Sequence, residues 1–85
     1  MIKELVTVKS KQGIDARPIA LLVQEASQYA SQVYIEMEAK KINAKSIMGM
    51  MSLSLVDGQV LAVVTNGEDE EAAAHGMVKF FERLK

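Results

Sequence analysis

The amino-acid sequence predicts an α+β fold in which helices cover one face of a four-stranded, mainly antiparallel sheet. Two observations lead to this prediction. Segments with strand-like and helix-like periodicity follow one another in the order β-α-β-β-α-β-α, and the strand-like segments alternate apolar and polar residues. Because alternating strands have one polar face, we expect the uncovered face of the sheet to meet water. The 85 residues show no linker or internal repeat and suit a single domain, residues 1–85.

Composition argues against several classes of function. The chain has no cysteine, which removes disulfides, thiolate chemistry and cysteine-based metal sites, and we expect no cofactor. Ten basic and eleven acidic residues leave a net charge of −1, so we expect no direct binding to nucleic acid. No apolar run approaches the roughly 18 residues of a membrane span, and the N-terminus lacks a secretion-signal pattern. We therefore expect a cytoplasmic protein that does not enter a membrane.

The first two elements are a strand and an amphipathic helix. Residues 2–9 alternate in the manner of a strand, with Val6 and Val8 on the expected core side. Apolar residues then recur every three to four positions and predict a helix over about residues 16–29. Pro18 suits the first turn of this helix, because the N–H that proline lacks would be unpaired there. The expected core stripe of the helix is Ile19, Leu22, Val23, Ala26 and Ala30.

The middle of the chain predicts a hairpin, a short helix and a fourth strand. Residues 32–37 and 40–44 are two short extended stretches that we expect to pair. Ser46 then precedes a short helical segment, residues 47–51, at a position where serine caps helices well. An Asp57-Gly58 turn leads into a strand over residues 59–65, which Asn66-Gly67 ends.

The last element is a helix that begins among acidic residues. Residues 68–71 are all acidic and complement the positive end of a helix dipole, whereas Arg83 and Lys85 complement the negative end. The expected core stripe of this helix is Ala74, Met77, Val78, Phe81 and Leu84.

Two stretches carry a family resemblance: GIDARPIA, residues 13–20, and NAKSIMGMMSL, residues 43–53. The chain resembles HPr, the phosphocarrier protein of the bacterial sugar phosphotransferase system, over its whole length. It is similar in particular to the HPr-like catabolite-repression proteins, the Crh type, of Gram-positive bacilli, through residues 22–26, 40–41 and 67–70. The resemblance implies an HPr-like open-faced sandwich and a protein that is not an enzyme.

At one position the chain departs from the phosphocarriers that it resembles. In HPr a histidine there receives a phosphoryl group from enzyme I, and this chain has Asp15, followed by Arg17 and Pro18 of the same motif. The resemblance therefore implies a degenerate phosphocarrier site. Asp15 has three readings: a helix cap, a fixed charge that imitates phosphohistidine, or an acyl-phosphate acceptor. The last reading is an alternative function, a phosphoryl carrier of the phosphotransferase system.

Ser46 has both a structural and a regulatory reading. A capping role is a sufficient reason for a serine at the start of a helix. The resemblance adds that this serine is phosphorylated by HPr kinase/phosphorylase with ATP, after which the protein acts as corepressor of catabolite control protein A. A phosphate at this position would gain amide hydrogen bonds and a favourable dipole.

The methionines that follow Ser46 also have two readings. A methionine-rich stripe usually packs into a core, yet a helix of one turn cannot hide all of them, and thioethers suit adaptable docking surfaces. We expect Met48 and Met51 to be largely exposed and Met50 to point inward. The resemblance implies that this segment and the outer side of the first long helix dock partners, and also that the chain can form a homodimer. The expected docking residues are Ala20, Leu21, Gln24, Ile47, Met48 and Met51.

His75 is the only histidine of the chain. Glu71 and Lys79 lie four residues to either side of it, so we expect His75 on the polar, solvated side of the last helix. One histidine without cysteine makes neither a catalytic triad nor a credible zinc site.

The turn of the hairpin is unusual for the family. HPr-like proteins commonly have Asn-Gly or Asp-Gly between these strands, which suits a positive φ, whereas this chain has Glu38-Ala39. Either the turn changes type or Ala39 carries strain of about 1–2 kcal/mol.

Overall fold

The elements of the structure follow the predicted order. The computed structural model describes residues 1–9, 16–38, 40–52 and 58–83. The predictions on Asp15, Ala39, Asp57, Leu84 and Lys85 therefore lie outside the described residues. The elements are β1 (Ile2–Thr7), α1 (Ala16–Ser27), β2 (Gln32–Met37), β3 (Lys40–Asn43), α2 (Ile47–Met51), β4 (Val60–Asn66) and α3 (Glu70–Arg83).

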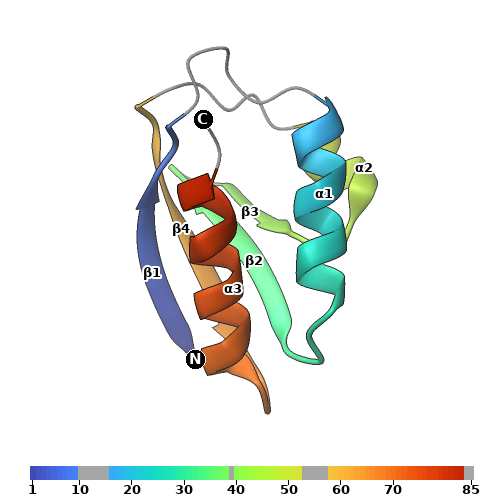
Figure 1. The fold of residues 1–85 in the computed structure, drawn as a ribbon, viewed down its shortest axis with the longest axis vertical. Helices are drawn as coiled ribbons and strands as arrows, with labels where there is room; N and C mark the ends of the chain where they lie inside the picture. Colours follow the sequence, from blue (N-terminus) through green and yellow to red (C-terminus); the bar gives the residue numbers. More distant parts are fainter. Residues whose placement is uncertain (10–15, 39, 53–57, 84–85) are drawn as a thin grey trace.

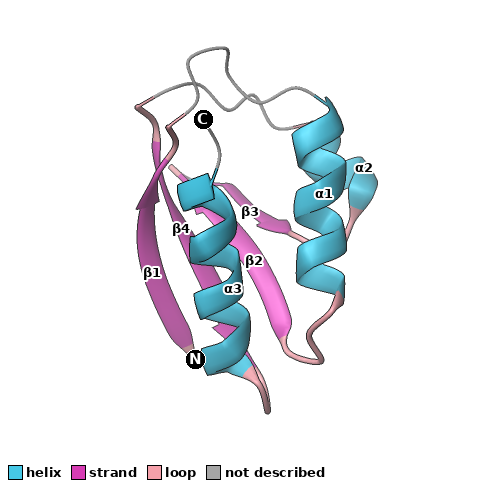
Figure 2. Ribbon diagram, in the orientation of Figure 1, coloured by secondary structure: helices cyan, strands magenta, loops and turns pink. Residues whose placement is uncertain are grey.

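The four strands form one sheet in the order β1-β4-β2-β3, with every neighbouring pair antiparallel. Both long helices lie over the same face of this sheet, α3 over β1 and β4 and α1 beside α2 (Figures 1 and 2). The predicted α+β architecture, an open-faced sandwich, is confirmed. In the described residues, no helix has the length and apolar character that crossing a bilayer requires.

The core lies between the sheet and the helices. Val63 of β4 is its centre on the sheet side, since it is opposite Glu4 of β1 and Ile35 of β2 and is fully buried. Burial of this apolar surface is the main stabilising contribution. The largest side chains with under 2% exposure are Phe81, Leu22, Ile35, Met50, Leu61 and Met77, and they come from both layers.

The predicted stripe of α1 is right except at its end. Ile19, Leu22 and Ala26 are buried, but Ala30 is exposed because α1 ends at Ser27, two residues earlier than predicted. The Ala30 amide donates instead to a side-chain oxygen of Asp69, 3.0 Å away. A tertiary contact with the start of α3 therefore takes the place of another helical turn.

The uncovered face of the sheet is less polar than predicted. Ala62 and Val64 of β4 point to this face, and only 4% and 2% of their surfaces are exposed. Lys3 on β1 is opposite Val64, and Glu36 on β2 is opposite Ala62; their charged ends meet at 3.3 Å. This ion pair joins the two strands that flank β4, so its aliphatic stems cover apolar side chains that no helix covers. Leu5 on the same face is 72% exposed.

The hairpin between β2 and β3 has left-handed backbone at Glu38, with φ of 52°. A non-glycine residue in this conformation carries strain of about 1–2 kcal/mol. The prediction left open a change of turn type or such strain at Ala39, which lies outside the described residues. The described part of the turn therefore shows strain one residue earlier.

Candidate functional site

Ser46 is the N-cap of α2. Its backbone is extended, with φ of −97° and ψ of 110°, and its carbonyl accepts the first helical hydrogen bond from the Met50 amide at 2.9 Å. The Ser46 Oγ accepts a hydrogen bond from the Gly49 amide at 3.2 Å. The hydroxyl satisfies an N–H that the helix start leaves without a partner, which is the physical reason for a serine here.

Three hydrogen bonds and one buried side chain hold Ser46 and α2 in place. The side chain of Asn43 accepts a hydrogen bond from the Lys45 amide at 2.9 Å, and the Asn43 carbonyl accepts one from the Ser46 amide at 3.0 Å. The Lys45 Nζ donates to the Tyr29 carbonyl, 2.6 Å away, just beyond the end of α1. Met50 is completely buried and anchors α2 in the core. The short helix is therefore held by the residues just before it, by the segment that follows α1 and by its own buried Met50.

The other apolar residues of α2 face outward. Met48 is 84% exposed, Met51 47% and Ile47 45%, whereas Met50 is 0% exposed. The predictions that Met48 and Met51 are exposed and that Met50 packs inward are confirmed. A helix of five residues can turn only one side to the core, so the remaining apolar side chains stay at the surface.

α1 adds further residues to this exposed surface. Leu21 is 48% exposed, Gln24 is exposed and Ala20 is half-buried. Figure 1 shows α1 and α2 side by side at one end of the sheet. The residues predicted to dock partners therefore come from two adjacent helices. We call the set Ala20, Leu21, Gln24, Ile47, Met48 and Met51 the docking face.

The predicted phosphocarrier remnant is described only in part. Arg17 and Pro18 belong to the first turn of α1, where proline is tolerated. Asp15, immediately before α1, lies outside the described residues. Its three readings stay predictions.

Gly49 is a positioning residue that sequence reasoning did not single out. A β-carbon on Gly49 would lie 3.3 Å from Ile42 Cγ2 and 3.4 Å from the Ser46 Oγ. The available signal was a glycine inside a short helical pattern, which commonly marks close packing. Here the absent side chain leaves space around the serine hydroxyl.

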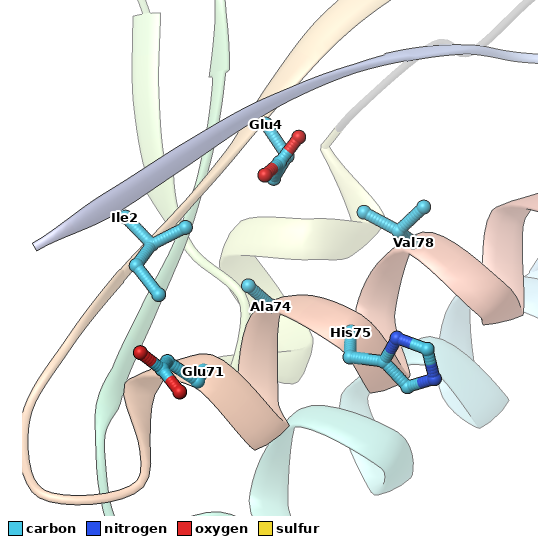
Figure 3. Close-up of a pocket in the computed structure, with 6 residues that line it drawn as sticks. All are labelled: Ile2, Glu4, Glu71, Ala74, His75 and Val78. Carbon is cyan, nitrogen blue, oxygen red and sulfur yellow. The ribbon is translucent and has the colours of Figure 1, made fainter.

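His75 lies apart from the docking face. It is exposed on α3, as predicted, and lines a shallow hollow of about 400 Å³ between β1 and α3. Figure 3 shows Glu4 and Glu71 at the same hollow. Within the residues that the structure covers, no group of three or more His, Cys, Asp or Glu side chains could hold a metal ion. The residues that line the hollow belong to β1 and α3, and none of them is a residue of the docking face.

Comparisons with known proteins agree on one family. Residues 2–83 match the family model described as PTS HPr component phosphorylation site. The HPr-like protein Crh of Halalkalibacterium halodurans is 46% identical over 83 residues, which cover 98% of this chain and 99% of the relative. The matching family is an HPr component and this relative is an HPr-like protein, and neither is an enzyme.

Solved structures give the same fold. The crystal structure of HPr-C-His from Thermoanaerobacter tengcongensis matches with a TM-score of 0.89 and 45% identity, over 96% of this chain and 92% of that one. Crh from Bacillus subtilis, a catabolite-repression protein described as a domain-swapped dimer, matches with a TM-score of 0.78 and 41% identity. This match covers 100% of the present chain and 98% of Crh.

Proposed function

The chain belongs to the HPr family, with proteins of the Crh type among its relatives, and on this premise we propose that it is a regulatory protein switched by phosphorylation of Ser46. The observation that supports this function is the position of Ser46. It caps α2 directly beside Ile47, Met48 and Met51, which are exposed apolar residues. A charge added at Ser46 would change the surface that a partner meets, without entering the core.

The proposed modification is transfer of a phosphoryl group from ATP to the Ser46 Oγ by HPr kinase/phosphorylase. The hydroxyl loses its proton, the Oγ bonds to the γ-phosphorus, and ADP leaves. Phosphoserine carries nearly two negative charges and three acceptor oxygens, and the Gly49 amide already points at this side chain. Phosphorylation then adds charge at a helix start, where the dipole favours it, and the fold is kept.

The proposed partner of the phosphorylated form is catabolite control protein A, in the cytoplasm. The phosphate would pair with basic residues of the repressor, while Met48, Met51 and Ile47 fill an apolar hollow. Close charge pairs that lose their water at an interface contribute several kcal/mol, and buried apolar anchors add to the affinity. The repressor, not this chain, would contact DNA.

A kinase assay tests the proposed modification. The protein is incubated with ATP and HPr kinase/phosphorylase, and its peptides are read by mass spectrometry. We expect one phosphate on Ser46, none on the Ser46→Ala variant, and an unchanged level on Ser52→Ala. Ser52 is the matched control because it lies at the other end of α2, where its hydroxyl donates to the Gly49 carbonyl. Unmodified Ser46 in the wild-type protein would contradict the proposal.

The second candidate function is a phosphoryl carrier that uses Asp15. The match of residues 2–83 to the family described as PTS HPr component phosphorylation site favours it. Incubation with phosphoenolpyruvate and enzyme I separates the two functions. A hydroxylamine-labile phosphate on Asp15 would establish the carrier and contradict the regulatory proposal. If the wild-type protein takes up no phosphate and Asp15→His does, the site differs from that of a phosphocarrier only in its nucleophile.

Self-association is the remaining proposed partnership. The Crh relative from Bacillus subtilis is described as a dimer. Sedimentation equilibrium over a concentration series would reveal a homodimer of this chain as a doubling of its mass.

A further inference from the structure

A groove between α1 and α3 continues the docking face beyond α2. It encloses about 390 Å³. Its α1 side carries residues spaced three, four and seven positions apart, which puts them on one face of the helix. The lining residues are Leu21, Gln24, Glu25 and Gln28 of α1, and Phe80 and Arg83 of α3.

Two residues belong to both the groove and the docking face. Leu21, 48% exposed, and Gln24, also exposed, lie on the outer side of α1. Phe80 of α3 is half-buried and lines the α3 side of the groove. A partner that covers Leu21 can therefore also contact Phe80, because both residues line the groove.

The charges of the groove specify what fits it. Glu25 accepts a hydrogen bond from the Tyr29 hydroxyl at 2.7 Å, and this bond, followed by burial, raises the pKa of Tyr29 to about 12. Within the described part of the chain, no carboxylate lies within ion-pair distance of the Arg83 guanidinium. The cation is exposed in the last turn of α3. Among the described residues that line the groove, Arg83 is the one cation, and its guanidinium suits a planar carboxylate.

We propose that this groove is a second contact region for the partner of the phosphorylated protein, which inserts an apolar side chain between Leu21 and Phe80 and presents a carboxylate to Arg83. The inference rests on the proposed function, because the partner is the repressor proposed above. It adds α3 to an interface otherwise formed by α1 and α2. It also gives the partner an acidic feature, beside the basic one that reads the phosphate.

Charge reversal at one position of α3 tests the groove. Each variant is phosphorylated on Ser46, checked by mass spectrometry, and titrated with the purified repressor. We expect Arg83→Glu to weaken binding about tenfold or more. Arg83→Lys, which keeps the charge but not the planar guanidinium, should weaken binding less than Arg83→Glu. Lys79→Glu is the matched control: it changes charge equally on an exposed residue of the same helix that does not line the groove. We expect its affinity within about twofold of wild type.

The outcomes separate the two proposals. If the phosphorylated wild-type protein does not bind the repressor, the proposed function is contradicted, and so is the proposed role of the groove in that complex. If wild type binds and Arg83→Glu binds as tightly as Lys79→Glu, only the groove is contradicted. Side-chain NMR gives a direct second measurement. Repressor should shift the signals of Phe80 and Arg83 in the phosphorylated protein, and unshifted signals would overturn the inference.

Discussion

Asp69 and Ser31 bind each other through both backbone and side chain. The Ser31 amide donates to Asp69 Oδ1 at 2.8 Å, the Ser31 hydroxyl donates to the same oxygen, and the Asp69 amide donates to the Ser31 Oγ at 3.1 Å. Ser31 is 2% exposed and precedes β2, whereas Asp69 precedes α3. The pair therefore joins two loops that are 38 residues apart in the chain.

These hydrogen bonds predict a dependence of stability on pH. The Ser31 hydroxyl, followed by the amides of Ala30 and Ser31, holds the pKa of Asp69 below its ordinary value of 3.8. Because the pKa of Asp69 is lower in the folded protein, its ionised form stabilises the fold at any pH above its pKa in the unfolded chain. This contribution is lost as the pH falls through its pKa in the folded protein. The urea concentration at which half of the wild-type protein is unfolded should therefore decrease as the pH is lowered below about 4.

Asp69→Asn removes the carboxyl group that titrates, and so tests how much of the loss of stability at acid pH comes from Asp69. The variant should be less stable than wild type at pH 7, and the difference should shrink below pH 4. Glu82→Gln, an exposed carboxylate of α3, is the control and should follow the wild-type curve. An Asp69→Asn curve parallel to wild type over the whole acid range would contradict this account.

A methyl group at Gly67 should destabilise the same junction. Gly67 has φ of 150°, and a β-carbon there would lie 2.7 Å from both the Ser31 Cα and its Oγ. Gly67→Ala should therefore lower the free energy of unfolding by about 2–4 kcal/mol, through backbone strain and forced displacement of Ser31. Gly58→Ala is the matched control, since Gly58 also has positive φ, 88°, but nothing lies within 4 Å. Equal losses from the two variants would show that the Ser31 contact does not matter.

Gly76 should be needed for the packing of α1 on α3. A β-carbon on Gly76 would fall 1.9 Å from the Tyr29 hydroxyl oxygen and 2.9 Å from a Glu25 oxygen. Gly76→Ala should lower stability by about 1–3 kcal/mol despite the better helix propensity of alanine. Tyr29→Phe removes the closest atom, so the double variant should lose less than the two single losses added together. Additive losses in urea denaturation would refute the contact.

The capping role of Ser46 can be measured without any partner. Ser46→Ala removes the acceptor for the Gly49 amide and should lower the free energy of unfolding by about 1 kcal/mol. Ser46→Asp keeps a capping acceptor and adds a charge that the helix dipole favours, so its stability should match wild type. A Ser46→Asp variant as unstable as Ser46→Ala would show that the site does not tolerate negative charge.

The sequence predicts the order and type of the elements because each has its own local signal. The stripe of Met77 and Phe81 on α3 and the capping serine before α2 need no tertiary information. Contacts between elements are different. Ala30 lies beyond the end of α1, and its amide donates a hydrogen bond to Asp69. Ala62 is buried on the face where the Lys3–Glu36 ion pair joins the two strands beside β4.

The candidate site divides in the same way. Exposure of Met48 and Met51 follows from the length of α2 and could be predicted from the sequence. The groove with Phe80 and Arg83 could not, because it exists only where α3 packs beside α1. Similarly, the space that Gly49 leaves beside the Ser46 hydroxyl depends on Ile42 of β3.

The most direct test of the account is the affinity of the purified protein for catabolite control protein A before and after phosphorylation. Isothermal titration should show binding that strengthens by about a hundredfold once Ser46 carries phosphate, since paired charges at interfaces contribute several kcal/mol. Met48→Ala should weaken binding of the phosphorylated form, because Met48 is 84% exposed and available to a partner. Equal affinity of the two forms would contradict the claim that Ser46 phosphorylation switches this protein.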